Sequence, residues 1–164
     1  YNAMKGMHHR DPGCAGAVLT DSRINAEIIA DGHHVHPTMI HILTKLKPEQ
    51  TILITDAVSA AGLGNGEYKL GDLDIVVNEG IARLKVGDSL AGSTLTMINA
   101  FKFMIREIGL PIESVSRMAS LYPARVLGMD QETGSIETGK RADLLLLNHE
   151  MDIQHVWIDG KCTV

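Results

Sequence analysis

The sequence predicts an α/β fold built on parallel strands and followed by a β-rich tail. Two apolar runs, residues 26–30 (AEIIA) and 51–55 (TILIT), have the length and composition of buried strands. Between them, residues 37–47 carry apolar side chains at helical spacing behind Pro37, which suits the first turn of a helix. Strand, helix and strand in this order are typical of a parallel βαβ unit, because parallel strands need a crossover connection.

The small number of predicted parallel strands limits the possible architecture. The chain has 164 residues, 45% of them hydrophobic, which is enough for one sizeable core. Two or three parallel strands with their helices cannot close an eight-stranded (β/α)8 barrel, so we expect them to form the last part of one. The opening residues 1–4 (YNAM) read like the middle of a domain, so we also expect a fragment of a longer protein.

The segments on either side of the predicted βαβ unit are interpreted from their turn-forming residues. Residues 1–16 are rich in Gly, His and Pro and are expected to form a loop. Residues 62–66 (GLGNG) lack the strand-to-helix context of a nucleotide-binding fingerprint and are expected to form a flexible loop. Residues 73–77 and 81–84, separated by the turn residues 78–80 (NEG), predict a β-hairpin.

Three helices and a β-rich tail are predicted beyond the hairpin. The first helix starts at Ser93, a good N-cap, and ends before Gly109. The second runs from about Pro111, and the third is a short one from Pro123 to near Gly128. Strands are expected at 142–147, 156–158 and 162–164, with a turn at 159–160 (DG).

Charge and apolar pattern exclude several classes of protein. The net charge of −5 includes no basic stretch, which argues against a nucleic-acid partner. The longest apolar stretches are strand-sized, so no membrane-spanning helix is expected, and no signal peptide is visible. Cys14 and Cys162 lie at opposite ends without a C-x-x-C pattern and are expected to be free thiols. Together these features favour a cytoplasmic protein.

Asp56 is the first candidate for chemistry. It follows the apolar run 51–55 directly, and active sites of parallel α/β folds collect at the C-terminal ends of strands. A carboxylate there can take a proton from a metal-bound water and pass it to a leaving nitrogen. From position alone, a capping or turn role is equally consistent.

A second candidate is the histidine cluster after the run 26–30. In an extended segment His34 and His36 would share one face and His33 the other. A histidine near a reacting carbonyl can polarise it, and an H-x-H pair can bind metal. Spacing alone favours surface or packing roles for at least two of the three.

Two further segments offer groups for binding. Arg10 carries a planar guanidinium suited to phosphate, although an exposed loop charge is the simpler interpretation. Asn2 and Ala3 offer backbone N–H groups to an anion. The run Ala91-Gly92-Ser93 opens a predicted helix and lies where it could contact substrate, with Ser93 more simply a cap.

Several strings resemble the N-acetylglucosamine-6-phosphate deacetylase family of the amidohydrolase superfamily. They are YNAM at 1–4, HRDPG at 9–13, IADGHHV at 29–35, TDA at 55–57, LAGS at 90–93 and MASLYPAR at 118–125. The tail GSIETGKRADL at 134–144 is similar to the wider superfamily. The resemblance covers essentially the whole chain, and the N-terminal strings are the substrate-specific ones.

The resemblance implies a fold and a domain division. It implies a (β/α)8 barrel with a small β-sandwich domain built from both chain ends. Residues 1–128 are then the C-terminal portion of the barrel, with an inserted hairpin at about 66–86. Residues 129–164 are the C-terminal strands of the small domain.

The resemblance also implies roles for individual residues. Asp56 matches the catalytic aspartate, general base and then general acid. His34 matches a histidine that contacts substrate near the scissile amide. The phosphate is bound by Arg10, from the same or a neighbouring subunit of a homodimer, with the backbone of Asn2 and Ala3. Ala91, Gly92 and Ser93 match a loop near the sugar.

The family's metal ligands, for zinc or iron, match no part of this chain and are expected upstream, with Asp56 a possible additional ligand. The chain alone is therefore expected to be inactive. Two other interpretations stay open: another amidohydrolase, dihydroorotase-like or deaminase-like, and a non-catalytic fragment or structural module. Arg10 and the loop at 1–4 favour a phosphorylated amino sugar over the former.

Overall fold

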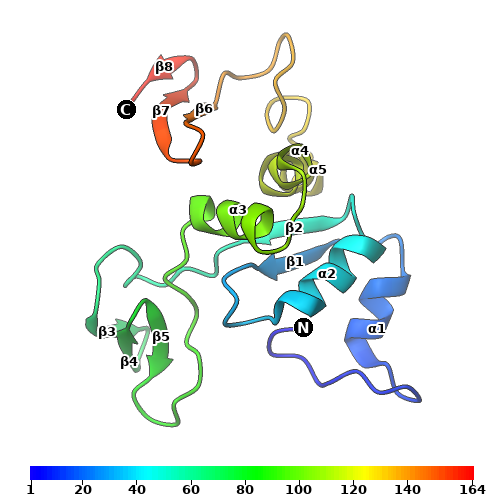
Figure 1. The fold of residues 1–164 in the computed structure, drawn as a ribbon, viewed down its shortest axis with the longest axis vertical. Coiled ribbons are helices and arrows are strands. Elements are labelled where there is room, and N and C mark those ends of the chain that lie inside the picture. The colour runs from blue at the N-terminus through cyan, green and yellow to red at the C-terminus, as the bar shows by residue number, and fades with distance from the viewer.

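Two parallel strands form the centre of the fold. The computed structural model describes residues 1–164. Strand β1 (Ala26–Ile29) pairs in parallel with β2 (Thr51–Ile54), and α2 (Pro37–Leu46) connects the two strands. The predicted βαβ unit is therefore confirmed. In Figure 1 the two strands lie in the middle of the molecule, with α2 on one side and α3 on the other.

Burial of apolar side chains on both faces explains why these strands form. The main core cluster takes Ile28 and Ile52 from the strands, Ile40 from α2, and Met104 and Val115 from the later helices. Strands covered on both faces are mostly apolar rather than alternating, which is the pattern of the two runs except at the exposed Glu27 of β1. Because the strands pack into this core, their C-terminal ends are held in a fixed position.

A buried lysine ties this unit to the preceding loop. Lys47, at the end of α2, is 2% exposed, and its Nζ donates to the carbonyl oxygen of Asp21 at 2.6 Å. Its aliphatic stem packs while its ammonium satisfies a carbonyl that would otherwise lose a partner.

We expect Lys47→Ala to lower the free energy of unfolding by ~2–4 kcal/mol, because it removes both the stem and the hydrogen bond. Chemical unfolding measures this loss. The exposed Lys45 of the same helix is the control, and Lys45→Ala should change stability by no more than ~0.5 kcal/mol. Equal effects of the two variants would contradict the bracing role of Lys47.

An antiparallel sheet follows β2. Its strands are β3 (Gly66–Leu70), β4 (Leu73–Asn78) and β5 (Ile81–Leu84). The predicted hairpin is confirmed as β4 and β5, whereas β3 was missed. The loop prediction for 62–66 holds only up to Gly66, where β3 begins. The sheet has its own small core around Ile75, Val77 and Ala82.

The helices differ from the prediction at their boundaries. Helix α3 (Met97–Arg106) begins four residues later than expected, with Thr96 as its N-cap. Helix α4 (Ile112–Ser116), a π-helical turn (Arg117–Leu121) and α5 (Tyr122–Val126) follow one another directly. The wider turn lies just before Pro123, which has no N–H to donate to an i−4 carbonyl.

The loop prediction for 1–16 is wrong at its end, because α1 (Gly13–Thr20) starts within it. This helix contacts α2. It has neither a side-chain cap nor a clear amphipathic pattern, so no helix signal is visible in its sequence. No helix of the chain is long and apolar enough to cross a membrane.

The tail forms a third small sheet, at the opposite end of the molecule from β3–β5 (Figure 1). It contains β6 (Leu144–Leu147), β7 (Ile153–Ile158) and β8 (Lys161–Cys162), all antiparallel. The predicted turn at 159–160 is confirmed between β7 and β8, with positive φ at both residues. Both cysteines are free. The overall fold is thus mixed α/β.

Candidate active site

The C-terminal ends of β1 and β2 lie at the same edge of the central sheet. Ile29 pairs with Ile54 at the ends of these strands. Two residues beyond each of these partners stands an aspartate, Asp31 after β1 and Asp56 after β2. Because the strands are parallel, both carboxylates are carried to the edge where α/β folds place their functional groups.

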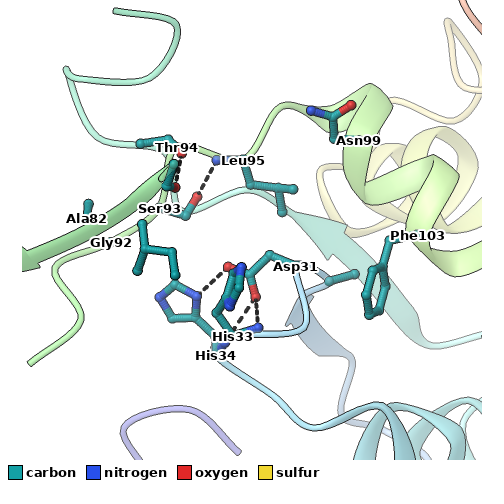
Figure 2. Close-up of a pocket in the computed structure, with 13 residues that line it drawn as sticks. Asp31, His33, His34, Ala82, Gly92, Ser93, Thr94, Leu95, Asn99 and Phe103 are labelled. Carbon is teal, nitrogen blue, oxygen red and sulfur yellow. Dashed lines mark hydrogen bonds and ion pairs between the residues drawn. The ribbon is translucent and has the colours of Figure 1, made fainter. Parts of the chain in front are cut away.

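A cavity of about 300 Å³ lies beyond β1 (Figure 2). One wall is the loop that carries Asp31, His33 and His34, and another is the segment Gly92–Leu95. Helix α3 adds Asn99 and Phe103. The cavity therefore joins segments that lie far apart in sequence, residues 31–34 and 92–103.

Asp31 and His34 form a buried pair at the base of this cavity. His34 Nδ1 lies 2.6 Å from Asp31 Oδ2, and the two side chains are only 3% and 10% exposed. The other carboxylate oxygen, Oδ1, accepts the backbone N–H of His33 at 2.9 Å and of His34 at 3.0 Å. Burial opposes ionisation of Asp31, but the N–H groups of His34 and His33 and the His34 ring outweigh it, so the pKa of Asp31 lies below its usual range.

The expected alternation of the three histidines is wrong. Residues 31–35 form consecutive bends rather than an extended segment, because the Asp31 carboxylate gathers two successive N–H groups. His33 and His34 consequently both line the cavity. His36 instead caps α2, accepting the N–H of Thr38 at 3.2 Å.

Asp56 lies in a second, larger concavity of about 510 Å³. It is exposed, has a positive φ of 51° and makes no side-chain hydrogen bond within the chain. Thirteen of the seventeen residues around this concavity are hydrophobic, and it extends along β1 to Tyr1 and Asn2. A carboxylate free of internal partners beside an apolar hollow is available to a ligand.

The segment Gly92–Ser93 lines the histidine cavity and lies against the backbone of Asp56. Ser93 forms an isolated parallel bridge with Ala57, its N–H donating to the Asp56 carbonyl oxygen at 2.8 Å. Gly92 lines the histidine cavity, and a Cβ placed on it would lie 3.8 Å from Asp56 Oδ2. The same Cβ would meet Val58 Cγ1 at 2.5 Å and the Asp56 carbonyl at 2.9 Å, at a φ of +59°. Only glycine fits this close approach.

The prediction that Ser93 caps α3 is wrong. Its hydroxyl donates to the Thr55 carbonyl and accepts the N–H of Leu95 at 3.0 Å. These bonds tie Ser93 to the end of the central sheet, and the helix begins only at Met97, with Thr96 as its N-cap. Ala91 is buried in the small core of the β3–β5 sheet and lines neither cavity.

Only part of the N-terminal loop lines these cavities. Asn2 lines the concavity that holds Asp56, whereas Ala3 is exposed with a positive φ of 56°. Arg10 is exposed and lies in neither cavity, with its Nη1 2.7 Å from His9 Nε2. Within one chain the guanidinium and Asp56 therefore do not share a pocket.

The structure adds Asp31, which the sequence analysis left without a role. The signal that could have found it is its spacing, since an aspartate three residues before a histidine can bond both its N–H and its ring. No group of three or more His, Cys, Asp or Glu side chains is arranged to hold a metal ion.

Comparison with known proteins agrees with the resemblance seen in the sequence. The amidohydrolase family model matches residues 6–163. A provisionally named N-acetylgalactosamine-6-phosphate deacetylase of Escherichia coli (strain K12) is 44% identical over 161 residues, covering 98% of this chain and 96% of that protein. An N-acetylglucosamine-6-phosphate deacetylase of Vibrio furnissii is 40% identical, covering 98% of this chain and 40% of its own length.

A solved structure is similarly close. It is a mutant N-acetyl-D-glucosamine-6-phosphate deacetylase from Mycobacterium smegmatis in complex with N-acetyl-D-glucosamine-6-phosphate, 39% identical to this chain, with a TM-score of 0.94. The match covers 100% of this chain and 44% of that one, so the chain spans about two fifths of the length of these longer relatives. By sequence and by fold, the chain belongs to the amidohydrolase family.

Proposed function

We propose that the intact protein hydrolyses the acetamide of N-acetylglucosamine 6-phosphate, releasing glucosamine 6-phosphate and acetate in amino-sugar catabolism. The observation that carries the proposal is the placement of Asp56 and the Asp31–His34 pair two to five residues beyond two neighbouring parallel strands. Family membership and the names of the relatives supply the reaction class. Those names favour a deacetylase over a dihydroorotase-like or deaminase-like enzyme.

We propose the following architecture for the intact protein. Residues 1–128 form the last part of a (β/α)8 barrel, with 66–86 inserted as a small sheet, and residues 129–164 belong to a small β-sandwich domain. The free edges of β1 and β2 and the apolar concavity beside Asp56 support this, since a barrel would cover them. The greater length of the relatives leaves room for the remaining strands.

Asp56 is assigned the proton transfers. As general base it takes a proton from the attacking water, whose oxygen adds to the acetyl carbon. Asp56 then gives the proton to the amide nitrogen. The C–N bond breaks, and acetate and the amine leave. His34 contacts the acyl group near the scissile amide, and Gly92–Ser93, with Ala91 beneath, shape the sugar site.

A divalent metal, zinc or iron, is proposed for the intact protein, where it would make the water more acidic. Its ligands are proposed to lie in the part of the relatives that this chain does not match. Residues 1–164 alone should therefore show no turnover.

The galacto epimer is a second candidate substrate. The relative named for N-acetylgalactosamine 6-phosphate is 44% identical to this chain, against 40% for the relative named for the gluco epimer. The kcat/KM values for the two phosphorylated epimers decide between them. A higher value for the galacto epimer would overturn the assignment to glucosamine.

Arg10 is proposed to bind the substrate phosphate in the site of a second copy, in a cytoplasmic homodimer. Asn2 and Ala3 would contact the same phosphate from the loop beside Asp56. The position of Arg10 outside both cavities of its own chain supports a contribution to a neighbouring subunit.

Arg10→Gln should raise KM for the phosphorylated sugar about 100-fold, because a charge-assisted paired contact is lost, and leave the slow turnover of the non-phosphorylated sugar unchanged. Arg23→Gln, on an exposed arginine paired with Asp21 at 2.6 Å, is the control and should leave KM unchanged.

Subunit mixing separates the two placements of Arg10. Random mixed dimers of Arg10→Gln and Asp56→Asn chains would regain about a quarter of wild-type activity, because half are mixed and each mixed dimer has one intact site. No recovery above the parent variants would contradict a contribution from the neighbouring subunit.

A further inference from the structure

One buried carboxylate beside the cavity takes no part in the proposed proton transfers. Asp31 is 10% exposed at its side chain, and both of its oxygens are used. Oδ1 holds the backbone of the loop through the N–H groups of His33 and His34, and Oδ2 holds the His34 ring at 2.6 Å. Figure 2 shows this carboxylate between the loop and the histidine ring, below the segment that carries Ser93.

The contact leaves only one ring nitrogen of His34 for a ligand. Nδ1 is taken by Asp31, and Nε2 makes no hydrogen bond within the chain. The only fully buried side-chain N or O atom without a partner is Tyr1 Oη, so the unbonded Nε2 is accessible, although its side chain is just 3% exposed. An accessible nitrogen on an otherwise buried ring that lines a cavity is placed to meet a ligand there.

The carboxylate also decides which nitrogen carries the ring proton. An ionised carboxylate only accepts hydrogen bonds, so Nδ1 must be the protonated nitrogen facing it. Nε2 is then a bare acceptor in the neutral ring. When Nε2 is protonated as well, the ring is a cation paired with Asp31 and donates from Nε2 to an oxygen in the cavity.

We propose that Asp31 is a positioning residue of the deacetylation reaction. It fixes the orientation of His34 and holds its Nδ1 proton, so that the doubly protonated ring, paired with the carboxylate, donates from Nε2 to the acyl oxygen of the substrate. This inference rests on the proposed function, in which His34 contacts the acyl group. Carboxylates that orient histidines in this way commonly change activity 10–100-fold when they are replaced.

Asp31→Asn in the full-length protein is the first test. The amide oxygen of asparagine can still accept the two backbone N–H groups, so the loop keeps its shape. Its NH2 group then faces Nδ1 and favours the ring form with the proton on Nε2. We expect kcat to fall ~10–100-fold, with KM within about threefold of wild type, because the neutral amide no longer stabilises the positively charged ring, which is the stronger donor to the oxygen that gains charge in the transition state.

The matched control is Asp21→Asn. Asp21 accepts the N–H of the residue two positions later at 2.9 Å, as Asp31 does, but it lies outside both cavities. This variant should leave kcat unchanged. An equal fall in kcat for both variants would show a general loss of loop structure and overturn the proposal.

A double-mutant cycle distinguishes positioning from structural support. If Asp31 acts through His34, then Asp31→Asn should lower kcat no further, within about twofold, once His34→Gln is present. A structural role would instead multiply the two losses. Multiplied losses, or wild-type kcat in the single Asp31→Asn variant, would overturn the proposal.

A second readout does not depend on turnover. Histidine ring 15N NMR of the metal-free full-length protein, with His34 assigned by His34→Gln, should show a protonated Nδ1 in wild type and a shift to the Nε2-protonated form in Asp31→Asn. A neutral His34 protonated on Nε2 in wild type would overturn the inference. Absence of deacetylation by wild type would refute the proposed function and with it the role of Asp31 in that reaction, whereas a wild-type ring without a protonated Nδ1 would refute the positioning of His34 by Asp31 alone.

Discussion

Replacing Asp56 with asparagine in the full-length protein will lower kcat for deacetylation about 10³-fold while KM changes little. Asparagine has nearly the same shape and tolerates the positive φ of 51° at this position, so the backbone should be preserved. What is lost is the ability to take a proton from water and return it to the leaving nitrogen. Because Asp56 makes no side-chain hydrogen bond within the chain, little stability should be lost with it.

Asp88→Asn is the matched control for Asp56→Asn. Asp88 is also exposed and also has a positive φ, 55°, but it follows β5 and lines neither cavity. It should keep wild-type kcat and KM. Steady-state rates of acetate release measure both variants. Full-speed turnover by Asp56→Asn would remove the carboxylate from the mechanism.

Gly92→Ala will damage both stability and catalysis, because a side chain here strikes the backbone that carries Asp56. The new Cβ would lie 2.5 Å from Val58 Cγ1 and 2.9 Å from the Asp56 carbonyl, at a φ that L residues avoid. We expect a loss of ~2–4 kcal/mol in unfolding free energy from strain and overpacking. The displaced Asp56 should lower kcat about 100-fold in the fraction that remains folded.

Gly62→Ala is the control that separates the cost of a positive φ from the cost of the steric contact at Gly92. Gly62 has a φ of +82° but nothing within 4 Å of an added Cβ. It should cost only ~1–2 kcal/mol from the left-handed backbone and leave kcat unchanged. If Gly92→Ala behaves like Gly62→Ala in both measurements, the close approach of Gly92 to Asp56 does not shape the site.

The central βαβ unit could be predicted because its signals are local and consistent. Two predominantly apolar runs of strand length flank a helix whose start is marked by Pro37, and most of their side chains are buried, apart from the exposed Glu27. The position of Asp56 follows from the same reasoning, since a polar residue directly after a buried parallel strand must lie at its C-terminal edge.

Two of the failures share a physical cause, which is hydrogen bonding between groups distant in sequence or outside regular structure. Ser93 has the chemistry of a helix cap, but its hydroxyl bonds to Thr55, 38 residues away, so the helix starts later. The histidine alternation failed because the Asp31 carboxylate bends the loop. Neither the partner of Ser93 nor the contact of Gly92 with Val58 leaves a pattern in the sequence.

We infer that this chain carries the proton-transfer carboxylate and the acyl-contacting histidine of a sugar-phosphate deacetylase. The most direct test incubates the full-length, metal-loaded protein with N-acetylglucosamine 6-phosphate and measures both products. We predict acetate and the free amino sugar in equal amounts. Release of ammonia in place of acetate, or no cleavage of the amide, would contradict the account.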